Sequence, residues 1–115
     1  IFGNVNMPQT IKVLGQQTPS AITATTLYTV PTGNSAVIST LSVCNLISTT
    51  ATYRIAIRPA AASLANVHYI VYDNTIQGND SVFLTIGASL AATDVITVYS
   101  SSASLTFNAY GTETY

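Results

Sequence analysis

The residues best suited to chemistry are a single histidine, His68, and a single cysteine, Cys44. A Cys–His pair can act as a nucleophile and its base, and both residue types bind zinc. Neither residue has neighbours at ligand-type spacing, and Cys44 lies in the apolar segment SVCNL, where a cysteine is ordinarily a small buried hydrophobe. We therefore expect no catalytic residue, no metal and no cofactor, and a protein that is not an enzyme.

The acidic residues are scattered: Asp73, Asp80, Asp94 and Glu113. General acid–base chemistry needs two carboxylates that converge in a cleft, and this spacing indicates no such pair. The turn Gly78–Asp80 contains oxygen ligands of the kind that Ca²⁺ prefers, but it lacks a calcium-loop pattern. Each aspartate falls at a predicted strand edge or turn, so we expect it to accept backbone N–H groups instead.

Arg54 and Arg58 are four residues apart on one predicted strand and therefore share a face. Three roles remain open for them: solvated side chains, ion pairs with Asp73 or another acid across strands, or anchors for a partner protein. Arginine is enriched at interaction hot spots.

Seven tyrosines and no tryptophan supply the aromatic surface. Tyrosine offers apolar area with one polar group, which suits both the edge of a core and an interface. The last residues, Tyr110–Tyr115, are predicted to form a short tail that docks on a neighbour. The candidate partner-interface residues are Arg54, Arg58, Tyr72, Tyr110 and Tyr115.

Charge is the most unusual feature of the composition. Charged residues make up 6% of the chain and the net charge is −1, whereas an average soluble domain has roughly 25% charged residues. Serine and threonine together supply about a quarter of the chain and take the place of charged surface residues. Hydroxyl side chains lose their water at lower cost than charges, so this composition favours a surface that is covered by other proteins.

The same composition excludes several partners. Lys12, Arg54 and Arg58 are the only permanent cations, too few for a phosphate-binding cluster, so we expect no nucleic-acid partner. No apolar run approaches the length of a membrane helix, so we expect no membrane association. The opening IFGNVNMPQ lacks the basic and apolar regions of a signal peptide. The triplet Asn79–Ser81 matches the pattern for N-glycosylation, but this modification occurs in secreted proteins, so we do not expect it here. The lone cysteine fits assembly in a reducing cytoplasm.

Short strand-like segments fill the chain. They are Thr10–Leu14, Ala21–Val30, Ser35–Ile47, Ala51–Arg58, Val67–Asp73, Ser81–Ile86, Val95–Ser100 and Ser104–Tyr110. Turn residues separate them at Pro31–Asn34 and at Gly78–Asn79. A helical turn is expected only within residues 60–66, and residues 87–94 are expected to form a loop.

Within these segments the pattern predicts which side chains share a face. In Ala51–Arg58, Tyr53, Ile55 and Ile57 are expected to point one way and the arginines the other. Val37, Leu41 and Val43 are expected to share one face of their strand.

Eight strands at this spacing, with no long helix between them, predict an all-β fold: a two-sheet antiparallel β-sandwich of the jelly-roll type. The length fits one domain, residues 10–115, preceded by an N-terminal arm, residues 1–9.

Four segments are similar in sequence to small structural proteins of tailed bacteriophages, the cyanophage type in particular. They are LYTVPTGNSAVISTLSVCN, ATYRIAIRPA, HYIVYD and LAATDVITVYSSSASLTFNAYGTE, which together span most of Leu27 to Glu113. The resemblance implies a β-sandwich component of the virion, assembled in the host cytoplasm. It supplies no catalytic residues.

The leading hypothesis is a capsid cement or decoration protein that stabilises the phage head. It is expected to associate with itself as a homotrimer and to contact the major capsid protein or other virion proteins. A tail, fibre, neck or baseplate component is the alternative. A carbohydrate-binding β-sandwich module is a further alternative, for which Tyr72 beside Asp73 is the best candidate site.

Overall fold

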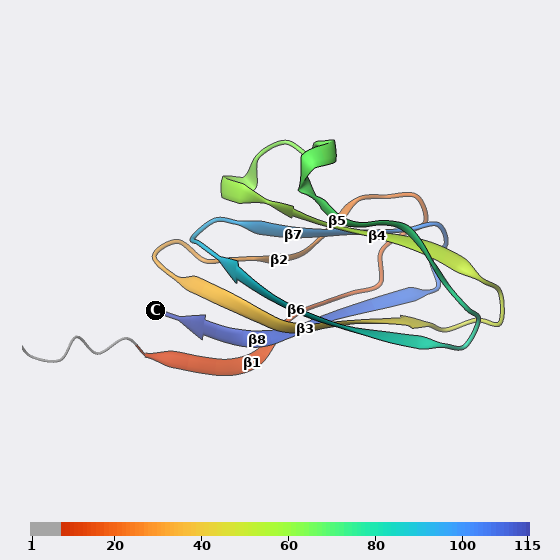
Figure 1. Cartoon of the computed structure of the whole chain (residues 1–115), viewed down its shortest axis with the longest axis horizontal. Helices are drawn as coiled ribbons and strands as arrows, with labels where there is room; N and C mark the ends of the chain where they lie inside the picture. Colours follow the sequence, from red (N-terminus) through yellow and green to blue (C-terminus); the bar gives the residue numbers. More distant parts are fainter. Residues whose placement is uncertain (1–7) are drawn as a thin grey trace, which may run out of the picture.

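The computed structural model describes residues 8–115 of the chain, and eight strands occupy most of this range. The strands are β1 (Gln9–Gln17), β2 (Thr25–Thr29), β3 (Ser35–Asn45), β4 (Ala51–Arg58), β5 (Tyr69–Ile76), β6 (Ser81–Leu90), β7 (Val95–Ser100) and β8 (Leu105–Thr114). They form two four-stranded antiparallel sheets that pack as a sandwich (Figure 1). Sheet A has the order β1-β8-β3-β6, and sheet B has the order β2-β7-β4-β5.

The strand order follows from pairing the first half of the chain with the second half in reverse. β1 pairs with β8, β2 with β7, β3 with β6 and β4 with β5, all antiparallel. This long double ribbon is rolled up so that β8 also pairs with β3 and β7 with β4. That arrangement is a jelly roll, so the predicted fold class is confirmed.

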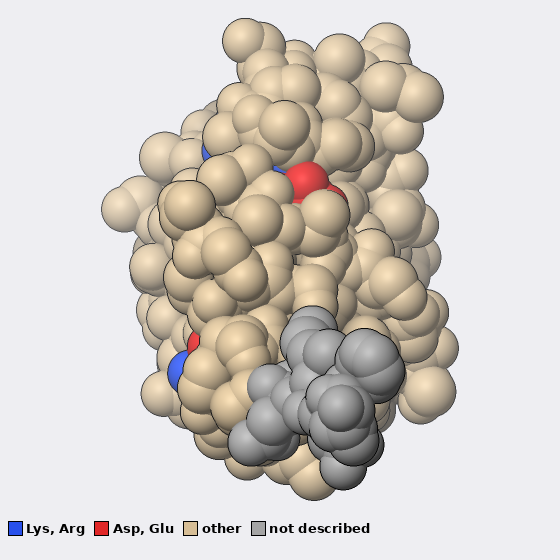
Figure 2. Space-filling model, turned by 90° about the vertical axis from the view of Figure 1, so that its left-hand side faces the viewer, with Lys and Arg blue, Asp and Glu red and all other residues tan. Residues whose placement is uncertain are grey.

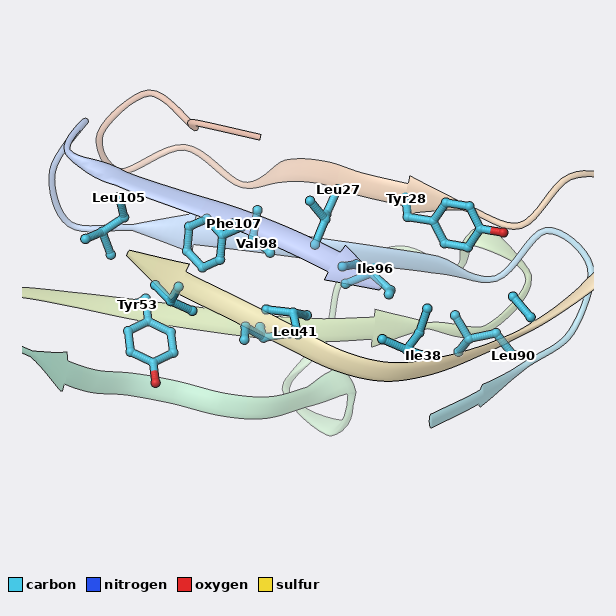
Figure 3. Close-up of a cluster of buried hydrophobic side chains, with 14 of the residues drawn as sticks. Leu27, Tyr28, Ile38, Leu41, Tyr53, Leu90, Ile96, Val98, Leu105 and Phe107 are labelled. Carbon is cyan, nitrogen blue, oxygen red and sulfur yellow. The ribbon is translucent and has the colours of Figure 1, made fainter. Parts of the chain in front are cut away.

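The core lies between the sheets and consists of the inward side chains of both (Figure 3). Tyr53 of sheet B and Phe107 of sheet A are fully buried and meet edge to face, with ring centroids 6.3 Å apart. The alternation predicted for Ala51–Arg58 is confirmed, because Tyr53 and Ile55 are buried in the core and Ile57 packs against it. Regular alternation on a half-buried strand is the pattern that a sandwich core requires.

The C-terminal segment is a strand and not a tail, so that prediction is wrong. Residues from Tyr110 to Thr114 continue β8 and pair with both β1 and β3. Gly111 permits this pairing, since a Cβ atom there would overlap the carbonyl oxygen of Val37. Tyr115 follows the strand, and its side chain bonds to Thr10 of β1 (hydroxyl oxygens 2.6 Å apart).

The prediction that Val37 shares a face with Leu41 and Val43 is also wrong. Leu41 and Val43 are fully buried, but Val37 is 45% exposed on the other side of the strand. The register shifts between Ile38 and Thr40, and this β-bulge reverses the facing of the residues before it.

The turns largely follow the sequence. In the turn at Pro31–Asn34, the Asn34 N–H donates to the Pro31 carbonyl oxygen at 3.0 Å and Gly33 has a φ of 85°. Two short 3-10 turns, η1 (Pro59–Ala61) and η2 (Asn66–His68), lie in and beside the segment predicted to contain a helical turn. The prediction of a loop over residues 87–94 is wrong for its first four residues, because β6 continues to Leu90. Of the predicted arm, residues 1–7 lie outside the described residues, and Gln9 already belongs to β1.

Candidate functional site

All three basic and all four acidic side chains lie in the described part of the chain, and every one of them bonds within the chain. Two ion pairs use four of them: Lys12 with Glu113, and Arg54 with Asp73. The other three bind backbone or hydroxyl groups: Arg58, Asp80 and Asp94. Within residues 8–115, two basic and two acidic groups are therefore neutralised in pairs, and the other three charged groups are held by neutral hydrogen-bonding groups.

The Lys12–Glu113 pair lies at the inner side of sheet A, at one end of the sandwich. Glu113 is buried and accepts a hydrogen bond from the Tyr28 hydroxyl of sheet B, while Lys12 Nζ lies 3.2 Å from the same carboxylate. The Tyr28 hydrogen bond, followed by the charge of Lys12, lowers the pKa of Glu113 below its ordinary value. Burial and the neighbouring carboxylate raise the pKa of the Tyr28 hydroxyl. This polar contact ties the two sheets together.

Among residues 9–114, which form the strands of sheet A, no charged residue lies on the outer face of that sheet. Along β8, the residues Leu105, Phe107 and Ala109 point into the core, so the residues between them point outward. The strand register extends this outward set to β1, β3 and β6. We call this set the neutral face, and its members are Gln9, Ile11, Val13, Gln16, Ser35, Val37, Ser39, Thr40, Ser42, Cys44, Ser81, Phe83, Thr85, Gly87, Ser89, Thr106, Asn108, Tyr110, Thr112 and Thr114.

Large apolar side chains stand out of this hydroxyl-rich surface. Ile11 is 86% exposed and Phe83 is 68% exposed, and each lies on an edge strand of sheet A. Ile11 and Val37 fall in one cross-strand row with Thr112 between them. Apolar residues separated by hydroxyl groups, with no charge among them, can be covered by a protein surface without leaving an unpaired charge.

The outer face of sheet B differs, because it carries an arginine enclosed by other side chains. Arg54 Nε donates to Asp73 Oδ1 at 2.6 Å, and Nη2 donates to Oδ2 at 3.2 Å. The guanidinium carbon lies 4.2 Å from the ring centroid of Tyr72 and 4.3 Å from that of Tyr99. The Arg54 hydrogen bonds lower the pKa of Asp73. We call Arg54, Asp73, Tyr72 and Tyr99 the Arg54 cluster.

A β-bulge in β5 builds this cluster. The pairing passes from Tyr53↔Asn74 to Ile55↔Val71, so Tyr72 and Asp73 together oppose Arg54 alone. Asp73 has a φ of 51°, a left-handed conformation that is uncommon for a residue other than glycine. Both side chains of the bulge can therefore contact the same arginine.

Arg58 is held separately on the same sheet. Its Nε donates to the Thr97 hydroxyl at 3.0 Å, and its Nη1 donates to the Ala62 carbonyl oxygen at 2.8 Å. Nearby, Asp94 accepts the Ala60 and Ala91 backbone N–H groups. These bonds fix the loops around η1 and the β6–β7 turn.

The structure does not bring the five candidate interface residues together. Arg54, Arg58 and Tyr72 belong to the outer face of sheet B, whereas Tyr110 lies on the neutral face and Tyr115 directly follows β8. The residues that sequence reasoning missed are Ile11, Val37 and Phe83. The alternation around Phe83 was a usable signal, but the bulge beside Val37 was not visible in the sequence.

Of the remaining candidates for chemistry, Cys44 and Asp80 lie at neighbouring strand ends, since Cys44 pairs with Ser81, whereas His68 belongs to η2, which contacts β4 of the other sheet. Cys44 is half-buried on the outer side of β3, and His68 ends η2, where its Nδ1 accepts the Ala65 N–H at 3.0 Å. Asp80 accepts the N–H of Ser81 in the turn. Residues 8–115 contain no cluster of three or more histidine, cysteine, aspartate or glutamate side chains able to hold a metal ion.

The surface at one end of the sandwich also carries little charge. Figure 2 shows this end, where most of the visible surface is neutral and the acidic atoms appear in two small spots, each beside a basic atom. Among the described residues no helix is both long enough and apolar enough to cross a membrane.

No protein-family model matches the chain, and no curated protein is significantly similar to it in sequence.

Proposed function

We propose that this chain is a non-enzymatic structural subunit that associates with other proteins through the neutral face, and that it serves as a capsid decoration protein of a tailed phage. The observation that carries the proposal is the distribution of charge. Every charged side chain is engaged inside the chain, and the whole outer face of sheet A has none.

The energetics of covering this face favour association. Burying an exposed apolar side chain such as Ile11 or Phe83 contributes about 1.5–3 kcal/mol if it becomes fully covered. Serine and threonine hydroxyls can exchange water for partner groups, whereas each buried lysine or glutamate would need an opposite charge. Two neutral faces also meet without repulsion, which suits self-association into a homotrimer or contact with a capsid subunit.

The size of the face is adequate for an interface. Four strands about 4.8 Å apart and about ten residues long at about 3.3 Å each give a flat area of about 600 Å². Side-chain relief adds accessible area to this figure. A standard protein interface buries about 800 Å² on each partner, so sheet A alone supplies most of one.

The assignment to a virion depends on the sequence resemblance to tailed-phage structural proteins described above. The resembling segments include β3, β4, β7 and nearly all of β8, with parts of β2 and β5, but they omit β1 and all of β6 except Leu90. They therefore include half of the neutral face, the part on β3 and β8. The absence of charge on the neutral face supports a subunit of a protein assembly, and the sequence resemblance indicates that this assembly is a virion.

Copy number in purified virions tests the assignment. Quantitative gel densitometry against the major capsid protein is expected to give a ratio within a small factor of one, and a virion reconstruction is expected to show the chain on the head with the neutral face covered. A small fixed copy number, with density on the tail alone, would contradict the decoration role and support a tail component.

A further inference from the structure

A hollow opens on the outer face of sheet B, away from the neutral face. It is lined by Asn66 of η2 and by Tyr69 and Tyr72 of β5, and its volume is about 450 Å³. Small-molecule sites commonly range from about 300 to 1,000 Å³. The hollow is therefore large enough to hold a small ligand.

The aromatic walls of the hollow contact each other and Arg54. Tyr69 and Tyr72 meet edge to face, with centroids 4.9 Å apart and planes at 84°. Arg54 stacks on Tyr72, and Asp73 holds Arg54 through two hydrogen bonds. The bulge with left-handed Asp73 sets this geometry, and bulges often re-aim side chains beside functional sites. Contacts of this kind restrict side-chain rotation, so that binding a ligand costs the two tyrosines less conformational entropy.

The polar groups of the hollow are uncharged and unused. The Asn66 amide and the Tyr69 and Tyr72 hydroxyls form no hydrogen bond with any other residue in the described range 8–115, although their neighbours His68 and Asn74 do. Each of these three groups can both donate and accept. Arg54 and Asp73 neutralise each other, so the hollow offers no unpaired charge to an anion or a cation.

We propose that this hollow binds a neutral pyranose ring of a glycan. A pyranose has an apolar C–H face, which fits the tyrosine rings, and a rim of hydroxyl groups that donate and accept, which fits the amide and the phenol hydroxyls. An acidic sugar finds no free cation there. Asp73 is bonded to Arg54 and therefore acts as a positioning residue, which holds Arg54 against Tyr72. The proposed sugar site lies beside Tyr72, on the side of Asn66.

Nuclear magnetic resonance titration tests the proposal with four probes: the methyl glycosides of glucose, galactose, mannose and N-acetylglucosamine. At least one is expected to shift the signals of Asn66, Tyr69 and Tyr72 in a saturable way. Tyr72→Ala is expected to weaken that binding by about tenfold or more. Tyr115→Ala removes a tyrosine ring that is 52% exposed, close to the 58% of Tyr72, from the residue directly after β8 and is expected to leave sugar binding unchanged.

A second variant guards against misfolding. Tyr72→Phe keeps the ring and removes one hydroxyl, so it is expected to retain binding with a smaller loss than Tyr72→Ala. Absence of saturable shifts with all four sugars would overturn the proposal, as would binding that Tyr72→Ala leaves intact. Shifts at the hollow caused only by virion proteins would also overturn it in favour of a protein partner. Copy number in virions is unaffected by any of these outcomes, so the proposed structural role is tested separately.

Discussion

The two outer faces of the sandwich are built from similar strands but differ in chemistry. The outer face of sheet A has about twenty outward residues and no charge, whereas that of sheet B carries Arg54, Asp73 and Arg58 among tyrosines. The low charge of the whole chain is therefore not spread evenly. It leaves one complete face without charge and places fixed, internally bonded charges on the other.

This difference separates two kinds of surface. A neutral face with protruding apolar side chains is suited to broad coverage by protein, because covering it removes hydration water from no charged group. A rigid cluster of tyrosines around a neutralised arginine presents fixed rings and hydrogen-bonding groups to something small. The two proposals made for this chain follow from that contrast, and each can fail alone.

The largest effect is expected from a charge placed on the neutral face. Thr112→Lys puts an ammonium group between Ile11 and Val37, where association would bury it without a partner. Self-association is expected to weaken by about tenfold or more, measured by sedimentation. The matched control is Thr75→Lys on the outer side of β5, which adds the same charge to sheet B. Equal weakening by both variants would contradict the special role of the neutral face.

The next largest effect concerns stability and the contact between the sheets. Tyr28→Phe removes the hydroxyl that donates to the buried Glu113 carboxylate and is expected to reduce the free energy of unfolding by about 1–3 kcal/mol, as measured by denaturant titration at fixed protein concentration. Tyr110→Phe is the control, since that hydroxyl has only a 3.5 Å contact with Ser42 on the neutral face. A loss for Tyr110→Phe as large as for Tyr28→Phe would refute the proposed tie.

The same contact predicts a pH dependence of stability. The pKa of Glu113 in the folded chain is below its ordinary value of 4.5, so the folded state holds fewer protons than the unfolded state in this range. Glu113 therefore contributes stability above pH 4.5, and this contribution disappears as the pH falls through the lowered pKa. Thermal melts from pH 6 to pH 2 are expected to be flatter for Glu113→Gln. An unchanged slope would show that another group governs acid unfolding.

The smallest effect is expected from the exposed ion pair of sheet B. Asp73→Asn removes the charge opposite Arg54 at the surface, where such pairs contribute little to stability. Neither the free energy of unfolding nor self-association is expected to change measurably, whereas sugar binding at the neighbouring hollow is expected to weaken. A marked loss of association would place the protein interface on sheet B instead.

Sequence reasoning predicted the fold where local patterns carry the information. Ala51–Arg58 alternates without interruption and ends before Pro59, and the structure reproduces this strand in full. The β8 extension was missed because Gly111 and Glu113 are weak strand formers. Their roles depend on contacts across strands, a close approach to Val37 for the glycine and a bond to Tyr28 for the glutamate.

The candidate sites were harder to predict, because β-bulges decide them. The bulge beside Ser39 turns Val37 outward, and the bulge at Asp73 brings Tyr72 and Asp73 to the same arginine. In a regular strand, side chains alternate between the two faces of the sheet, so the face of each residue can be predicted from its position in the sequence. A β-bulge adds one residue and thereby moves the side chains beyond it to the opposite faces. The pairing of Arg54 with Asp73 was one of three roles that the sequence left open, and the structure selects it.

The central claim is that the neutral face is covered by protein in the working state. Light scattering of the purified chain at micromolar concentration tests this claim most directly. The proposed function predicts a stable oligomer, with three chain masses for a homotrimer. A monomer that stays soluble and shows no tendency to associate at that concentration would contradict it.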